Sequence, residues 1–199
     1  MKKLTTLFVL LFFIAACSNE RSLLPKPRIY PKIEFPERAY KDFINPDCPF
    51  KTRIPSYTEY RKDSNKNESE KQFDCWFDLH SSELNAFLHL SYVSFEGRKR
   101  FDELVQDAFE MVDKHNSKAN YRDELAISYP ETSVYGLLFE IDGPVASPLQ
   151  FYLTDSLEHF LRGSLYFKAE VNRDSILPVY EFVKQDLQPF FDEFEWLEN

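Results

Sequence analysis

The chain has 199 residues and a formal net charge of −9 at pH 7, with 33 acidic against 24 basic side chains. This balance argues against nucleic-acid binding and against docking on anionic lipid through Lys and Arg, because both require a basic surface. Only four glycines occur, which excludes a glycine-rich phosphate loop, whereas 20 Phe, 11 Tyr and two Trp favour a sheet-rich core.

The first 17 residues have the pattern of a secretory signal. Two lysines precede a largely apolar stretch over residues 4–14, which closes on two alanines and Cys17. The stretch is too short for a permanent transmembrane helix, which needs about 20 apolar residues. Residues 14–17 match a bacterial lipobox, so we expect residues 1–16 to be removed and the Cys17 thiol to carry lipid. The alternative is an ordinary cleaved signal in which Cys17 is incidental.

Cleavage before Cys17 would leave 183 residues, enough for one domain, and would change the net charge to −11 because two lysines are lost. Residues 17–24 then form a lipidated tether. Residues 25–60 form an extended arm, since its prolines exclude helix. The aromatic residues of this arm either pack on the domain or form a docking strip for another protein. They are Tyr30, Phe35, Tyr40 and Phe43. Residues 61–71 lack apolar side chains and predict a solvated loop.

Residues 72–199 are expected to form a single α+β domain on which the arm packs. Alternating apolar side chains predict a series of strands, of which the first two form an antiparallel hairpin. The predicted strands cover residues 73–79, 84–93, 125–129, 134–141, 149–153 and 160–169. The run over residues 134–141 is nearly continuous in apolar residues, which favours a central place in the sheet.

Two amphipathic helices complete the predicted domain. The first spans residues 98–115, where apolar side chains recur at i, i+3, i+4 and i+7. The second begins near Asp174, and its apolar stripe extends to Trp196 and Leu197 with a kink expected at Pro189. The order of the elements predicts an antiparallel sheet of about five to six strands with two main helices packed on it.

Cys48 and Cys75 are the cysteines that remain after the lipidated one. An even pair in an oxidising compartment predicts a disulfide. It would close a loop of about 28 residues and stabilise the fold by roughly 3.5 kcal/mol in the chain-entropy model. The alternative is two separate buried thiols.

Asp155, His159 and Arg162 form the best candidate polar cluster, because they gather around one predicted turn. Such a cluster could serve an enzyme or a small-ligand binder. The alternative is that Asp155 caps the turn and Arg162 pairs with an acid. The histidines lack the spacing of a zinc site, so no metal or cofactor is expected. His89 is expected to be a hydrogen-bonded histidine on a sheet face.

Seven segments together are typical of a known family. They are residues 27–31 (PRIYP), 48–50 (CPF), 75–77 (CWF), 88–92 (LHLSY), 134–141 (VYGLLFEI), 146–156 (ASPLQFYLTDS) and 159–167 (HFLRGSLYF). In combination they resemble the gliding-motility lipoprotein GldD family, over essentially the whole chain.

The resemblance implies a lipid-anchored, periplasm-facing accessory protein of the gliding machinery, which is tied to type IX secretion. Its partners would be protein components of that machinery, its membrane contact would be the lipid alone, and no enzymatic reaction is assigned. Inner and outer membrane both stay open. The leading hypothesis is therefore a non-enzymatic interaction protein. The alternative is a lipid-tethered enzyme or ligand binder that uses Asp155, His159 and Arg162.

Overall fold

The structure is a computed structural model, and it describes residues 32–62, 75–168 and 173–198. The predicted signal peptide, Cys17, the tether and the first residues of the arm lie outside the described residues, as does most of the predicted loop at 61–71. The chain divides into two units, residues 1–32 and 33–199, and the fold below is that of the second unit.

The described elements follow one another as strands interrupted by helices. They are β1 (Tyr40–Ile44), β2 (Phe50–Pro55), β3 (Glu59–Lys62), β4 (Cys75–Ser81), β5 (Ala86–Ser94), α2 (Gly97–Asp113), β6 (Tyr121–Tyr129), the 3₁₀ turn η2 (Pro130–Thr132), β7 (Val134–Asp142), β8 (Leu149–Thr154), β9 (His159–Phe167), α3 (Arg173–Asp186), α4 (Gln188–Asp192) and β10 (Glu195–Trp196).

Seven of these strands form one antiparallel sheet in the order β3-β4-β5-β9-β8-β7-β6. The predicted α+β class is confirmed, and each predicted strand has its counterpart in this sheet. The sheet is wider than the predicted five to six strands because β3, which joins the end of the predicted arm to the first two residues of the predicted loop, pairs with β4. A second, three-stranded sheet has the order β1-β2-β10.

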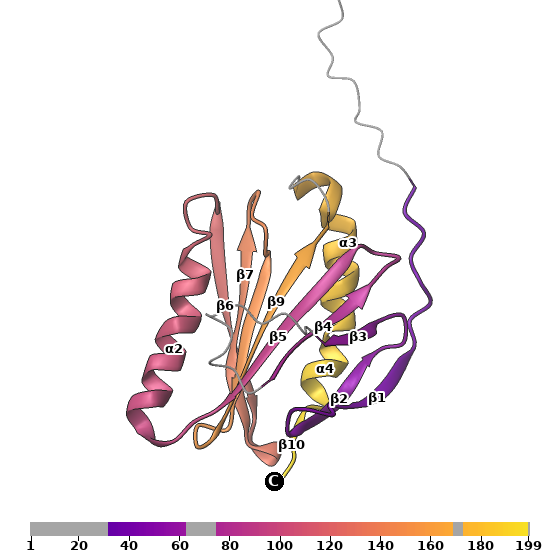
Figure 1. The fold of residues 1–199 in the computed structure, drawn as a ribbon. Helices are drawn as coiled ribbons and strands as arrows, with labels where there is room; N and C mark the ends of the chain where they lie inside the picture. Colours follow the sequence, from indigo (N-terminus) through magenta and orange to yellow (C-terminus); the bar gives the residue numbers. More distant parts are fainter. Residues whose placement is uncertain (1–31, 63–74, 169–172, 199) are drawn as a thin grey trace, which may run out of the picture. The chain divides into compact units, whose positions relative to one another are not determined.

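The two faces of the large sheet are covered by different elements (Figure 1). Helix α2 packs on one face through Leu104, Ala108 and Val112, which recur every four residues and therefore share one side of the helix. The other face is covered by α3, α4 and the small sheet. Because successive side chains of a strand point to opposite faces, the strands β4, β5, β7, β8 and β9 contribute to both cores.

Strand β7 is not central, as its sequence predicts, but lies next to the edge strand β6. Its apolar run has another cause. Val134 and Leu138 belong to the core under α3 and α4, whereas Phe139 and Ile141 belong to the core under α2. Both faces of the strand are therefore buried by helices, which requires apolar residues at successive positions wherever the strand lies in the sheet.

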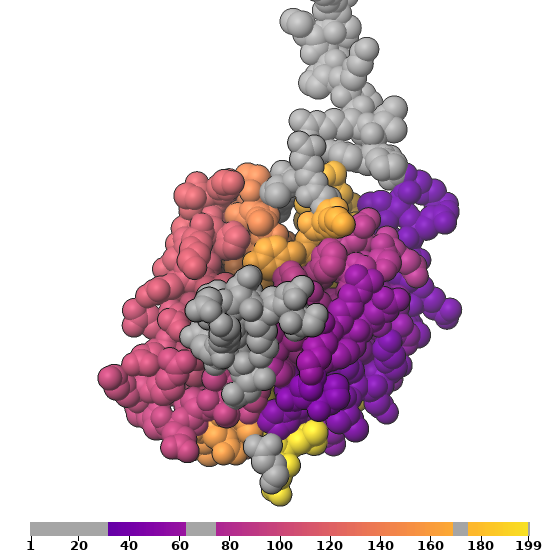
Figure 2. Space-filling view, viewed as in Figure 1, coloured from indigo at the N-terminus to yellow at the C-terminus, as the bar shows by residue number. Residues whose placement is uncertain are grey.

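Residues 33–62 include the predicted arm up to residue 60 and the first two residues of the predicted loop; they contain strands β1, β2 and β3 and belong to the same compact unit as the helices. Figure 2 shows these residues, in indigo and violet, against the magenta strands of the large sheet. Phe43 contacts Phe50, Tyr60 and Phe77 at ring-centroid distances of 5.9–6.3 Å. Tyr30 lies outside the described residues.

The C-terminal segment differs from the predicted single kinked helix. Helix α3 ends at Asp186, and a separate short helix, α4, begins at Gln188 with Pro189 in its first turn. Proline has no backbone N–H, so it ends one hydrogen-bond ladder and suits the first turn of the next. The prediction that Trp196 continues the helical stripe is wrong, because Trp196 lies in β10 opposite Phe50 of β2.

Candidate functional site

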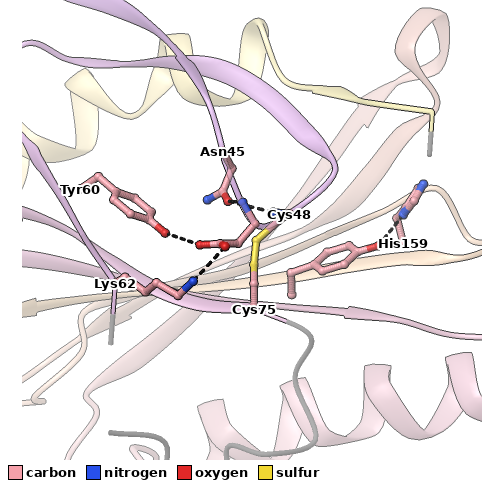
Figure 3. Close-up of a disulfide and its surroundings, with 8 residues drawn as sticks. Asn45, Cys48, Tyr60, Lys62, Cys75 and His159 are labelled. Atoms are coloured by element: carbon pink, nitrogen blue, oxygen red, sulfur yellow. Dashed lines mark hydrogen bonds and ion pairs between the residues drawn. A yellow bond between two sulfur atoms is a disulfide. The ribbon is translucent and has the colours of Figure 1, made fainter. Parts of the chain in front are cut away.

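The structure contains a disulfide between Cys48 and Cys75, with the Cα atoms 6.1 Å apart (Figure 3). Cys48 lies in the turn between β1 and β2, and the side chain of Asn45 shapes this turn by accepting the backbone N–H of Cys48 at 2.9 Å. Because Cys75 opens β4, the bridge ties the small sheet to the large one. This is a site that stabilises the fold.

Asp155 closes the loop between β8 and β9. Its Oδ1 accepts the backbone N–H groups of Leu157, Glu158 and His159 at 2.9, 3.0 and 2.9 Å. A carboxylate used in this way satisfies three backbone donors that the strand pairing leaves open.

His159 is buried and held from three sides on the face that α3 and α4 cover. Its Nδ1 lies 2.8 Å from the Tyr92 hydroxyl, its Nε2 lies 3.2 Å from Glu158 Oε1, and its ring stacks on Trp196 with centroids 4.9 Å apart. Donor atoms of Asp155, Glu158 and His159 lie within 4.8 Å of one another, a spacing that a metal could use. These atoms already serve contacts within the chain.

Arg162 does not join this group. It is three residues after His159 on the same strand, so its side chain points to the opposite face of the sheet. The flanking residues agree, because Phe160 belongs to the core under α2, whereas Leu161 belongs to the core on the other face. The structure therefore brings Asp155 and His159 together and places Arg162 elsewhere.

The face under α2 carries two rows of polar and aromatic side chains across four adjacent strands, β4, β5, β9 and β8. The first row, in strand order, is Trp76, Ser91, Arg162 and Tyr152. The second row is Asp78, His89, Ser164 and Gln150. Directly opposed residues have Cβ atoms about 4.5–5.5 Å apart, so each row is a line of neighbours. The predicted hydrogen bond of His89 on a sheet face is confirmed, with Asp78 Oδ1 as the partner of Nδ1.

Five members of these rows line a cavity of about 260 Å³, which we name the Arg162 cavity. Its walls are Trp76, His89, Leu90, Ser91, Arg162, Ser164 and Tyr166 from the sheet and Met111 from α2. A smaller hollow adjoins it, shares Met111, Arg162 and Ser164, and is also lined by Gln150. Gln150 is only 5% exposed, and its Nε2 makes no hydrogen bond within the part of the chain that the structure describes.

Burial governs the electrostatics of the Arg162 cavity. Desolvation lowers the pKa of Arg162 from its usual value, and Asp107 of α2 partly offsets this effect. Burial also raises the pKa of Tyr166, so its hydroxyl stays protonated. The cavity therefore presents one guanidinium and several hydroxyl groups beside three aromatic rings, and the adjoining hollow adds the primary amide of Gln150.

The second row has the residue types of a catalytic triad, in the order Asp78, His89 and Ser164. Nucleophilic catalysis requires the imidazole to reach the serine hydroxyl. No hydrogen bond joins His89 to Ser164 among the described residues, whose contacts include the His89–Asp78 bond.

The sequence predicts which lining residues of this cavity share a face of one strand, but not that the strands are neighbours. Alternation predicts that Arg162, Ser164 and Tyr166 share a face of one strand, and likewise His89 and Ser91 of another. It does not predict that β5 and β9 are neighbours, because 64 residues separate the start of β9 from the end of β5.

The fold and its sites define an α+β protein that is built on an antiparallel sheet and cross-linked by a disulfide. Residues 20–196 match the family described as gliding motility lipoprotein GldD. The match covers most of the chain, so the chain belongs to the GldD family of gliding motility lipoproteins.

Two further comparisons add little. A comparison with curated protein sequences finds no match. Among solved structures, the chain is similar to the solution structure of cyanobacterial PsbP (CyanoP) from Synechocystis sp. PCC 6803. The sequence identity is 10% and the TM-score 0.44, over 81% of this chain and 94% of that chain.

Proposed function

We propose that this protein is a non-enzymatic, periplasm-facing interaction protein of the gliding machinery, linked to type IX secretion and held at a membrane by lipid on Cys17. The observation that carries the proposal is the family match over residues 20–196. The lipobox at residues 14–17 supports it independently, because a cysteine thiol at this place can accept a diacylglyceryl group.

The anchor in this proposal is the lipid. No helix among the described residues is long and apolar enough to cross a membrane. One acyl chain gives only weak, reversible binding, and two or more make the attachment stable, at roughly 0.8 kcal/mol per buried CH₂. The tether of residues 18–24 would let the domain extend at most about 25 Å from the anchor.

The non-enzymatic part of the proposal is supported by how the predicted polar cluster is used. Asp155 accepts three backbone N–H groups, and His159 is held by Tyr92 and Glu158. Side chains engaged in this way serve the fold, and Arg162 on the opposite sheet face cannot complete a site with them.

Gene deletion tests the proposal, and colony spreading is the measurement. We expect the deletion strain to stop spreading and the wild-type gene to restore movement; normal spreading without the gene would refute the proposal. A Cys17→Ser form is expected to lose membrane attachment and to fail in complementation. Immunoblots must show equal abundance, and a fully soluble form that restores movement would overturn the role of the anchor.

Single substitutions separate the proposal from the enzyme or ligand-binder alternative. His159→Ala and Arg162→Ala are tested one at a time, because the two side chains lie on opposite faces of the sheet. An interaction protein should lose spreading only when the variant also loses stability or a partner captured by cross-linking. Loss of spreading by both variants at normal stability and with normal partner capture would favour the alternative.

A further inference from the structure

We infer that the Arg162 cavity binds a small anionic ligand, in which a carboxylate or phosphate group is attached to a flat apolar body. The inference rests on the lining of the cavity and not on the proposed role in gliding. A protein without any part in motility could still bind such a ligand.

The donors on the sheet face select an anion. Arg162 and Ser91 are directly opposed on β9 and β5, and Ser164 and Gln150 are directly opposed on β9 and β8. Arg162 and Ser164 are two residues apart on one strand, so the four groups form a compact patch. A guanidinium has five N–H donors in a fork that matches carboxylate and phosphate oxygens, so Arg162 can keep the interaction it already makes and still donate to an anion.

Gln150 is an independent indication that this place is built for a polar guest. Burial of an amide N–H without a hydrogen bond destabilises a folded protein, and native structures rarely tolerate it. Gln150 is 5% exposed, and its Nε2 makes no hydrogen bond to a described residue. It lines the hollow that shares Met111, Arg162 and Ser164 with the Arg162 cavity. An oxygen of a bound anion would satisfy it.

The size and the walls of the cavity suggest the rest of the ligand. A volume of about 260 Å³ far exceeds the roughly 10–15 Å³ that a single water needs. Trp76, His89 and Tyr166 supply aromatic surface, and the rings of His89 and Tyr166 meet edge to face with centroids 5.0 Å apart. Aromatic walls of this kind favour a flat apolar body beside the charged group.

The charge of the protein sharpens the specificity. The chain is strongly acidic, so its surface does not attract anions in general. Arg162 already interacts with the negative charge of Asp107, which partly offsets its desolvation, so a bound anion gains less from this guanidinium. We therefore expect modest affinity, with a Kd on the order of 1 mM or tighter for a ligand of about ten heavy atoms.

The test uses the mature lipoprotein in detergent, with benzoate and phenyl phosphate as probes and benzyl alcohol as the neutral counterpart. Calorimetry on the wild type measures the Kd. Fluorescence then localises the binding, because the chain has two tryptophans and only Trp76 lines the cavity. In Trp196→Phe the remaining indole reports on the cavity directly, and we expect a saturable change with either anion.

Variants of the cavity and a matched control complete the test. Arg162→Gln is expected to raise the Kd at least about tenfold, Arg162→Lys less, because lysine keeps the charge but loses the fork. Gln150→Leu should weaken binding severalfold. Arg100→Gln removes the same charge near the start of α2, where Arg100 pairs with Glu103 at 3.2 Å and does not line the cavity, and should change the Kd less than twofold. Melting temperatures show that each variant is folded.

Three results would overturn the inference. The first is no saturable binding of either anion at about ten times the expected Kd, which would mean that the cavity holds water only. The second is equal binding of benzyl alcohol, which would remove the requirement for charge. The third is unchanged affinity in folded Arg162→Lys and Gln150→Leu proteins.

Discussion

Asp186 links the N-terminal strands to the C-terminal helix, and its removal should destabilise the protein strongly. This carboxylate lies in the last turn of α3 and is 1% exposed. It accepts the hydroxyl of Tyr57 at 2.7 Å, the hydroxyl of Tyr40 at 3.0 Å and the Nε–H of Arg38 at 3.1 Å. All three donors come from residues 33–62, so one side chain holds this segment against α3.

The loss of unfolding free energy expected for Asp186→Ala depends on how exposed each of the three donors is. Hydrogen bonds to a charged group contribute about 1.5–3 kcal/mol each when water cannot replace them. Arg38 is 42% exposed, so its ion pair counts for under about 1 kcal/mol. Burial raises the pKa of Tyr57 more than that of Tyr40. The hydrogen bond from the Tyr57 hydroxyl to Asp186 therefore contributes most to the expected loss of stability. We expect a total loss of about 3 kcal/mol, or a Tm lower by roughly 6–12 °C.

Urea unfolding of the mature protein measures this loss, and Asp192→Ala is the matched control. Asp192 also accepts a tyrosine hydroxyl, that of Tyr129 at 2.6 Å, but its side chain is exposed and water can take its place. The control should lose about 0.5 kcal/mol. A loss below about 1 kcal/mol in Asp186→Ala, or equal losses in the two variants, would refute the reasoning from burial.

The remaining predictions concern the disulfide, alkaline pH and close backbone packing. The double variant Cys48→Ser, Cys75→Ser should lose roughly 3.5 kcal/mol of the free energy of unfolding, measured with urea. Reduced wild type should unfold at the same urea concentration as the double variant, and a midpoint unchanged by reduction would contradict the prediction. Burial and its hydrogen bond to an acid raise the pKa of Tyr60 to about 12. The folded state therefore keeps a proton that the unfolded state loses near pH 10. The contribution of Tyr60 to the free energy of unfolding is complete below pH 10 and is lost as the pH rises toward 12. Tyr60→Phe should flatten that decline in a pH series of melting temperatures, and an equally steep decline would count against it. Gly136→Ala should cost at least about 2 kcal/mol because its Cβ would lie 1.9 Å from the carbonyl oxygen of Tyr152; a Tm within error of wild type would show that the two strands can separate at no cost.

Helix α2 and the β4–β5 hairpin show what local pattern can predict. The apolar period of 3.6 residues over 98–115 predicts a helix, and α2 spans Gly97–Asp113. Alternation over 73–79 and 84–93 predicts an antiparallel pair, and β4 and β5 pair with Ser81 opposite Ala86. In both elements the deciding interactions join residues near in sequence.

The predicted polar cluster shows where such reasoning ends. Proximity in sequence grouped Arg162 with His159, although an odd separation along a strand sends the two side chains to opposite faces. The residues directly opposite Arg162 on the neighbouring strands are instead Ser91 of β5 and Tyr152 of β8. Sequence spacing gives no measure of these contacts, because they depend on strand order.

By itself, the sequence determined helix α2 and the strands β4 to β9, the apolar face of that helix, and the family resemblance. Only the tertiary structure decided that β5 lies between β4 and β9, that β7 lies near an edge, and that Arg162 lies between Ser91 and Tyr152 rather than beside Asp155. The physical reason is that periodicity follows from the geometry of one element, whereas strand order and register follow from burial shared among segments far apart in the chain.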